Sequence, residues 1–136
     1  MKGCLMNVSD VMTADPVTLD VGVSLRRAFA VLDELDVRHL PVIEEGRLVG
    51  MLSDRDLREV RAALSENGGN MPRVADLMSG DVVSVDPETD LVEVIQIMLE
   101  EKFGALPVVD DDDRVIGIVS YVDLLREFAK TLSSEG

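Results

Sequence analysis

Hydrophobic and polar positions follow one order along the chain and then repeat it. Short apolar runs over 16–19 and 82–85 predict a strand at the start of each half. Apolar residues then recur at helical spacing, which predicts one amphipathic helix in each half. The apolar faces hold Leu25, Ala28, Phe29, Leu32 and Leu35 in the first helix, and Leu91, Val94, Ile95, Met98 and Leu99 in the second. Asp90 with Glu93 predicts a capping box at the start of the second helix.

The remainder of each half predicts a hairpin and a last helix. A strand opened by Pro41 or Pro107 leads into an acidic turn, over 44–46 or 110–113, and a second strand follows. Helices are expected over roughly 54–64 and 121–132. The predicted order is therefore β-α-β-β-α, twice.

The two halves are also copies in sequence. Residues 8–57 align with 74–124, with an offset of 66 up to Gly46 and of 67 after it. Sixteen of the 50 aligned pairs are identical, so the chain is a tandem duplication. We assign residues 8–64 to the first copy, 65–73 to a polar linker and 74–132 to the second copy. Because each copy alone is marginal for independent stability, we expect an α/β (α+β) fold in which the two sheets pack together about a pseudo-twofold axis, with the helices outside.

Composition and charge restrict the partners and the chemistry. Thirteen Lys and Arg against 27 Asp and Glu give a net charge of −14, which disfavours nucleic acid and membrane surfaces. Cys4 and His39 are the only residues of their kinds, too few for a structural zinc site, and the acidic turns lack a calcium-loop spacing. A single thiol and no signal-peptide pattern favour the cytoplasm. Without a nucleophile–base pair, a metal set or a phosphate-binding glycine loop, we expect no enzymatic activity and no required cofactor.

A Gly-x-x-Ser-x-x-Asp pattern ends each hairpin. It consists of Gly50, Ser53 and Asp56 in the first copy and of Gly117, Ser120 and Asp123 in the second. The glycine would let a backbone or a ligand approach closely, and the serine falls where a helix start favours phosphate. The aspartate, one helical turn later, offers a carboxylate to the two hydroxyls of a ribose. The same Ser-x-x-Asp spacing also forms a capping box that only satisfies helix N–H groups, and both interpretations stay open.

Three motifs, in the same order in both copies, resemble the cystathionine-β-synthase (CBS) domain. They are DVMT-x-DPVTL and DLMS-x-DVVSV at the starts, RHLPV and GALPV in the middle, and GMLSDRDL and GIVSYVDL at the ends. Over about residues 8–130 the resemblance implies a tandem CBS pair, or Bateman module, with helices on one side of mixed sheets. It also implies clefts for adenosine-containing ligands and a regulatory, non-catalytic role. The implied base pocket consists of Val17, Thr18, His39, Leu40 and Pro41 in the first copy, and of Val83, Ala105, Leu106 and Pro107 in the second.

The two implied sites differ in charge. The first contains Arg38 and Arg55, where the second has Gly104 and Val122. Because guanidinium groups suit phosphate, we predict that the first site holds the phosphates of AMP, ADP or ATP. The second site suits a less charged adenosyl group, as in S-adenosylmethionine, or no ligand. The alternative for Arg55 is a solvated helix residue paired with a nearby carboxylate.

Two functions follow from the sequence. One is a sensor of adenine nucleotides that modulates an unidentified effector protein, and the other is a ligand-free interaction and dimerisation module. Apolar residues occupy well over half of the circumference of the helix over 91–99, more than one sheet face needs, and Ala30 and Val31 widen the first helix similarly. We therefore predict a homodimer through these helices, with Val92 and Ile97 in the contact.

Overall fold

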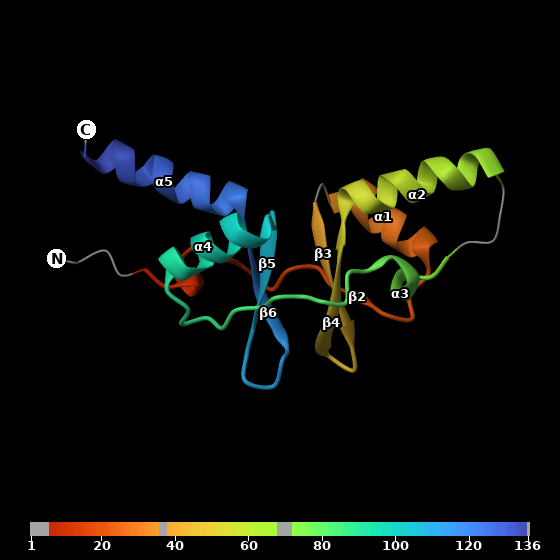
Figure 1. Cartoon of the computed structure of the whole chain (residues 1–136), viewed down its shortest axis with the longest axis horizontal. Coiled ribbons are helices and arrows are strands. Elements are labelled where there is room, and N and C mark those ends of the chain that lie inside the picture. The colour runs from red at the N-terminus through yellow and green to blue at the C-terminus, as the bar shows by residue number, and fades with distance from the viewer. Residues whose placement is uncertain (1–5, 36–37, 68–71, 136) are drawn as a thin grey trace. The chain divides into compact units, whose positions relative to one another are not determined.

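The helix, hairpin and last helix predicted for each half recur in the computed structural model, which describes residues 6–35, 38–67 and 72–135 (Figure 1). The first repeat contains η1 (Val8–Asp10), β1 (Thr13–Ala14), β2 (Leu19–Asp20), α1 (Leu25–Leu35), β3 (His39–Glu44), β4 (Arg47–Ser53) and α2 (Asp54–Asn67). The second contains α3 (Val74–Leu77), α4 (Leu91–Glu101), β5 (Ala105–Val109), β6 (Val115–Ser120) and α5 (Tyr121–Glu135). The predicted α/β class is confirmed, and so is the element order, except that an isolated bridge at Val85 stands in place of the first strand of the second repeat. Helix α2 extends into the predicted linker, of which residues 68–71 lie outside the described part.

Two three-stranded sheets carry the fold. One has the order β2-β3-β4, with β2 parallel and β4 antiparallel to β3. The other has the antiparallel order β1-β6-β5, and Val85 adds a parallel bridge to Val108. In each case the two long helices of the same repeat lie on one side of the sheet (Figure 1).

Each repeat lends its opening segment to the sheet of the other. Strand β1 of the first repeat pairs with β6, and Ser79 of the second repeat exchanges two backbone hydrogen bonds with Met51 of β4, at 3.0 and 3.2 Å. Val8 and Val74, which are aligned, are fully buried in the core of the other repeat. The compact units are therefore unit 1, Met1–Pro16 with Val83–Gly136, and unit 2, Val17–Val82.

Aliphatic side chains form a separate core in each unit. The core of unit 2 consists of Leu19, Leu25, Ala28, Phe29, Val31, Leu40, Val42, Leu52, Leu57 and Val74. The core of unit 1 consists of Val8, Val85, Val94, Met98, Leu106, Val108 and Val119. In both, the hairpin strand that carries the Leu-Pro-Val motif supplies alternate residues to the core, Leu40 and Val42 in β3 and Leu106 and Val108 in β5, as the period of two in a strand requires.

The glycines of the duplicated motif make room for methionines. A Cβ built on Gly50 would collide with the Sδ of Met78 and lie 2.8 Å from its Cγ. A Cβ on Gly117 would meet Met12 in the same way. The close approach expected at these glycines is therefore made by a side chain of the opening segment.

Several local predictions need correction. The first strands were predicted over 16–19 and 82–85, but β2 begins only at Leu19, and in the second repeat only Val85 is bridged. Pro16 has no N–H to donate, and in the second predicted strand only Val85 makes backbone hydrogen bonds, with Pro107 O and Val109 N. Asp90 caps α4 by accepting from Val92 N at 2.8 Å, where a capping box with Glu93 was predicted.

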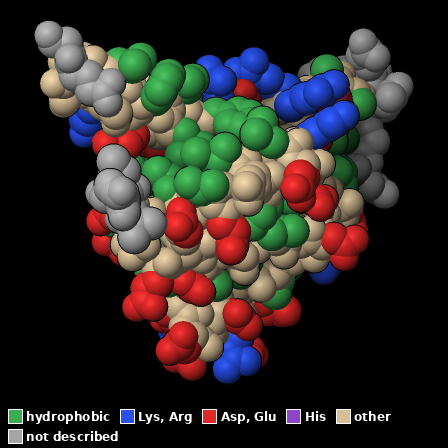
Figure 2. Space-filling model, turned by 60° about the vertical axis from the view of Figure 1, so that its left-hand side comes forward, with side chains coloured by type: hydrophobic (Ala, Val, Ile, Leu, Met, Phe, Trp, Pro, Cys, Tyr) green, Lys and Arg blue, Asp and Glu red, His purple; other side chains and the backbone are tan. Residues whose placement is uncertain are grey.

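The predicted self-association surface also needs correction. Val31 of α1 is buried in unit 2 and is not available to a partner, whereas Ile97 is half-buried against the core of unit 1 and offers a partner only part of its side chain. Val92 is exposed as predicted. Figure 2, which brings the side of α4 and α5 forward, shows hydrophobic side chains gathered on that side. Within the described part of the chain, no helix combines the length and the apolar character that a membrane span requires.

Candidate functional site

A pocket of about 440 Å³ opens in unit 2 beside the start of α2. Its lining residues are Leu32, Arg38, His39, Ser53, Asp54, Arg55 and Arg58. The hairpin brings the two sides together, because His39 of β3 and Ser53 of β4 are register partners. Four residues predicted from the sequence, Arg38, His39, Ser53 and Arg55, therefore share one cavity.

Backbone and side-chain hydrogen bonds fix the entry of α2. Asp54 N donates to the carbonyl oxygen of Arg38 at 2.7 Å, which ties the chain before β3 to the first residue of the helix. Ser53 Oγ accepts from Asp56 N at 3.1 Å and so caps the helix. The positive end of the α2 dipole is thereby aimed at the pocket, where it favours an anion.

The charge of the pocket is positive, although the chain is acidic overall. Three guanidinium groups line it, against the single carboxylate of Asp54. Arg58 lies 3.0 Å from Asp54, and Arg55 lies 3.5 Å from Glu59, both along the surface of α2. Because solvent-exposed ion pairs contribute little, these guanidinium groups can exchange a carboxylate for a phosphate at small cost.

Among the residues that line the pocket, His39 is the one whose ordinary pKa lies near neutral pH. Burial of its imidazole is the main cause that lowers the pKa of His39 below its ordinary value of 6.5, and the neighbouring Arg38 lowers it further. Asp54 and Asp56 act in the opposite direction. The net direction keeps the imidazole neutral at neutral pH, so it can offer one ring nitrogen as donor and one as acceptor.

Asp56 lies beside the pocket rather than in its wall. Its side chain is exposed, and no described residue makes a hydrogen bond or an ion pair with its carboxylate. The remaining predicted residues of this copy belong to the sheet region outside the pocket wall: Leu40 and Pro41 are buried in β3, Val17 is exposed and Thr18 is half-buried just before β2. The structure therefore gathers the predicted phosphate ligands and His39 in one pocket and leaves the other predicted base-contact residues outside its wall.

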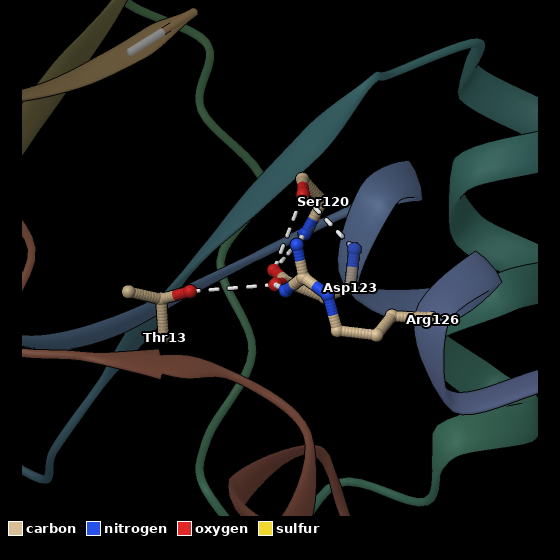
Figure 3. A network of polar contacts seen from close by, with 4 residues as sticks. All are labelled: Thr13, Ser120, Asp123 and Arg126. Atoms are coloured by element: carbon tan, nitrogen blue, oxygen red, sulfur yellow. Dashed lines mark hydrogen bonds and ion pairs between the residues drawn. The ribbon is translucent and has the colours of Figure 1, made fainter. Parts of the chain in front are cut away.

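The aligned aspartate of unit 1 has a different environment (Figure 3). Asp123 is only 9% exposed, and its Oδ2 accepts from Ser120 N at 2.9 Å and from Ser120 Oγ at 3.2 Å. Its Oδ1 accepts from Thr13 Oγ1 of β1 at 3.3 Å and lies 3.7 Å from Arg126. Ser120 Oγ in turn accepts from Asp123 N at 3.3 Å, which completes a reciprocal capping box.

The other residues predicted for the second site lie in β5 or close to its bridge with Val85. Ala105, Leu106 and Pro107 are buried in β5, and Ala105 is the register partner of Ser120. Tyr121 N donates to Gly104 O at 3.2 Å, the same link that joins Asp54 to Arg38 in unit 2. Val83 is half-buried before the Val85 bridge. Of the two interpretations of Ser-x-x-Asp, capping therefore describes unit 1, whereas in unit 2 only the serine caps and the carboxylate is available.

Three lining residues, Leu32, Asp54 and Arg58, were not predicted from the sequence. Arg58 lies three residues after Arg55, so helical spacing places it on the same side of α2. Asp54 precedes Arg58 by four residues, and this spacing on a helix indicates an ion pair between them. Among the described residues, no cluster of three or more His, Cys, Asp or Glu is placed to hold a metal ion.

Comparison with known families agrees with the duplicated motifs. A family model described as the CBS domain matches residues 8–63 and 74–130. The chain belongs to the CBS-domain family. It is 32% identical over 120 residues to the CBS domain-containing protein YhcV of Bacillus subtilis, a match that covers 88% of this chain and 84% of YhcV. It is also 32% identical to a homoserine O-acetyltransferase of Methanohalobium evestigatum, of whose length the match spans only 23%.

Solved structures of CBS-domain proteins share the fold. The CBS domain pair of protein MJ0100, in complex with 5'-methylthioadenosine and S-adenosyl-L-methionine, is 26% identical with a TM-score of 0.81, and the match covers 93% of this chain and 98% of that one. CBSX2 in complex with AMP is 33% identical with a TM-score of 0.77, with 92% and 97% covered. The cytosolic domain of the Mg²⁺ channel MgtE in complex with ATP is 31% identical with a TM-score of 0.74, with 88% and 48% covered. CBS-domain proteins similar to this chain thus bind adenosine-containing ligands.

Proposed function

We propose that this protein is a regulatory module that binds an adenine nucleotide in unit 2 and modulates a partner protein. The observation that carries the proposal is the pocket in which Arg38, Arg55 and Arg58 lie beside the N-terminus of α2. Three guanidinium groups in one cavity of a chain with a net charge of −14 are a local reversal of the global field. Such a reversal is what an anionic ligand requires.

Different residues would bind the phosphates, the ribose and the adenine of the ligand. The arginines and the N-terminus of α2 would hold phosphates, with Ser53 as a further hydroxyl donor. The free carboxylate of Asp56 would accept from the ribose hydroxyls. Backbone groups near His39 and Leu40, with Val17 and Thr18, would contact the adenine, as the family resemblance implies.

Charge supports a phosphorylated ligand over an uncharged one. The relatives bind AMP, ATP, or S-adenosyl-L-methionine and 5'-methylthioadenosine. In unit 2 the cations favour AMP, ADP or ATP. In unit 1, Asp123 already has partners in Thr13 and Ser120, which makes this the weaker site for a ribose.

The role we propose is regulatory rather than catalytic. The matched relatives with enzyme names are longer chains, of which this chain spans about a quarter. The proposal includes a homodimer and an unidentified effector protein. The second candidate function is a ligand-free interaction module, which the exposed apolar side chains of α4 and α5 favour.

Isothermal titration calorimetry with ATP, AMP and adenosine tests the nucleotide site. Replacing Asp56 by Ala should weaken all three ligands, by about 1.5–3 kcal/mol for a hydrogen bond to a charged group. Replacing Arg55 by Ala should weaken ATP more than adenosine, because only phosphate interacts with the guanidinium group. Equal affinities for the unmodified chain and Asp56→Ala would contradict the assignment, and loss of ATP binding in Asp123→Ala alone would transfer the site to unit 1.

A further inference from the structure

The ion pair between Asp54 and Arg58 lies in the wall of the pocket in unit 2. Arg58 Nε is 3.0 Å from Asp54 Oδ1, and both residues line the cavity. The neighbouring ion pair of α2 is placed differently, because Arg55 lines the pocket but its partner Glu59 does not. The side chain of Asp54 is 25% exposed, and that of Glu59 is 68% exposed. Asp54 is therefore the carboxylate with which an anion bound in the pocket has to compete.

The fold itself does not require this ion pair. Asp54 and Arg58 align with Tyr121 and Leu125 of the second repeat, neither of which carries a charge at neutral pH. The backbone link at the helix start is nevertheless the same in both units. Asp54 N and Tyr121 N each donate to the carbonyl oxygen of the residue that precedes the first hairpin strand. The helix is thus positioned without the ion pair, so the ion pair is open to a role in the pocket.

Helical geometry gives the charged residues of α2 an order around the helix. At about 100° per residue, Arg55 lies about 100° around the axis from Asp56, and Arg58 lies about 160° in the same direction. Asp54 follows at about 200°. Asp56 is the residue to which we assign the ribose. A chain of phosphates that extends from this ribose over the pocket therefore meets Arg55 first and the Asp54–Arg58 pair last.

Charge decides whether a ligand can open the ion pair. A terminal phosphate carries a charge of about −1.5 to −2 at pH 7 and three acceptor oxygens, whereas a carboxylate carries a single charge. Because the Coulomb attraction grows with charge, a phosphate placed at Arg58 outcompetes Asp54 for the guanidinium group. The single phosphate of AMP is held earlier, by Arg55 and the N-terminus of α2, and leaves the ion pair closed.

We propose that the Asp54–Arg58 pair makes the pocket selective for the number of phosphates. Arg58 binds the terminal phosphate of a nucleoside di- or triphosphate, and Asp54 holds Arg58 when the ligand is a monophosphate. Arg58 is then a specificity-determining residue, and Asp54 is an internal competitor for it. The inference rests on the proposed nucleotide site and adds to it the class of nucleotide that the site prefers.

Isothermal titration calorimetry with ATP and AMP tests the role of Arg58. The unmodified chain should bind ATP more tightly than AMP. Arg58→Gln should raise the Kd for ATP by about tenfold or more, as expected for a lost hydrogen bond between charged groups, and the Kd for AMP by less than about threefold. Equal losses for the two nucleotides would overturn the inference.

Asp54→Asn tests the competition, and Glu59→Gln is its matched control. Each substitution removes one carboxylate charge from an ion pair of α2 and keeps the size of the side chain. Asp54→Asn releases Arg58, so it should lower the Kd for ATP more than the Kd for AMP. Glu59→Gln should affect ATP and AMP alike, because both ligands meet Arg55. A larger gain for AMP than for ATP in Asp54→Asn would mean that a monophosphate already reaches Arg58, and would overturn the proposal.

The double variant Asp54→Asn with Arg58→Gln separates a direct contact from neutralisation of Asp54. If Arg58 binds phosphate itself, the double variant should bind ATP about tenfold or more weakly than Asp54→Asn alone. If Arg58 only neutralised Asp54, these two variants would have the same affinity for ATP. That second result would overturn the proposal.

Asp56→Ala distinguishes failure of this inference from failure of the nucleotide site. It should weaken ATP and AMP alike, because both contain the ribose. If the unmodified chain bound neither nucleotide, both proposals would fail. If Asp56→Ala and Arg58→Gln each weakened both nucleotides equally, only the selectivity would fail. The Arg58 side chain is 78% exposed, so Arg58→Gln should keep the far-ultraviolet circular dichroism of the unmodified chain, and its retained affinity for AMP would show that the pocket is intact.

Discussion

Asp56 and Asp123 occupy aligned positions, and their surroundings set opposite expectations for substitution. Asp123 is buried and accepts from Ser120 and Thr13, so Asp123→Ala should lower the free energy of unfolding by about 1–3 kcal/mol. Asp56 is exposed and its carboxylate has no partner among the described residues, so Asp56→Ala should change the unfolding free energy by no more than about 0.5 kcal/mol. Urea denaturation of the two variants measures both values. A larger loss in Asp56→Ala than in Asp123→Ala would refute this division of roles.

His39 makes stability depend on pH in a defined direction. Because its folded pKa is lowered, the unfolded chain binds the proton more readily, and the folded state gains stability from His39 fully above pH 6.5. That contribution is lost as the pH falls through the folded pKa. Between about pH 7 and about pH 5, His39→Gln should therefore lose less unfolding free energy than the unmodified chain. Parallel losses in denaturation series at several pH values would show that His39 does not titrate in this way.

The same imidazole links pH to the proposed ligand. Bound phosphates would raise the pKa of His39, so binding of ATP should take up a proton. ATP affinity should then increase as the pH falls from about 8 to about 6, and His39→Gln should flatten this dependence. Calorimetry in two buffers of different ionisation enthalpy detects the proton directly, and identical heats in both would exclude the coupling.

Single residues also mark the limit of what the sequence predicts. The resemblance to the CBS domain assigned Arg38, His39, Ser53 and Arg55 to one site, and the hairpin with the helix that follows it brings them into one pocket. The partner of Asp123 could not be predicted, since Thr13 lies 110 residues away and reaches it only through strand pairing across the repeats. Thr13 belongs to the duplicated opening motif. The local sequence does not indicate whether the strand that contains it pairs within its own repeat or with the other repeat.

At the scale of secondary structure, the contact between the hairpin strand and the opening segment accounts for the glycine of each motif. Gly50→Ala should destabilise the chain by about 1–3 kcal/mol, because the new Cβ meets the Cβ and Cγ of Met78 as well as its sulfur. A shorter side chain at position 78 would remove the collision. In a double-mutant cycle, Gly50→Ala should therefore cost much less in the Met78→Ala background than in the unmodified chain. Additive costs would mean that the two residues do not meet.

Helices and hairpins were predicted with better accuracy than the edges of the sheets. Periodicity identified α1, α4 and both hairpins, since each buries one face within a short stretch of chain. The hairpin of unit 2 turns through Glu45 and Gly46, both at positive φ, as a tight two-residue turn requires. The strands predicted over 16–19 and 82–85 are nearly absent. A strand needs a partner strand to pair with, and apolar content alone does not show where that partner lies.

For the whole molecule, the exchange of opening segments predicts that mutations act across the repeats. Val8→Ala removes a fully buried side chain from the core of unit 1, and Val74→Ala does the same in unit 2. Each should cost about 1–3 kcal/mol. Hydrogen exchange followed by mass spectrometry should show lost protection mainly in residues 83–135 for Val8→Ala, and mainly in residues 19–64 for Val74→Ala. Loss confined to the repeat that contains the substitution would contradict the exchange.

The exchange of opening segments also determines the order in which the two units can fold. Unit 2 is continuous in the chain, whereas the two parts of unit 1 flank it. Forming unit 1 from an unfolded chain therefore requires closure of a loop as long as unit 2, and the contacts that close it have high contact order. During synthesis, all of unit 2 leaves the ribosome before the second part of unit 1 does. We expect the pocket beside α2 to form first, and the pairing of β1 with β6 to form only after residues 83–136 have been made.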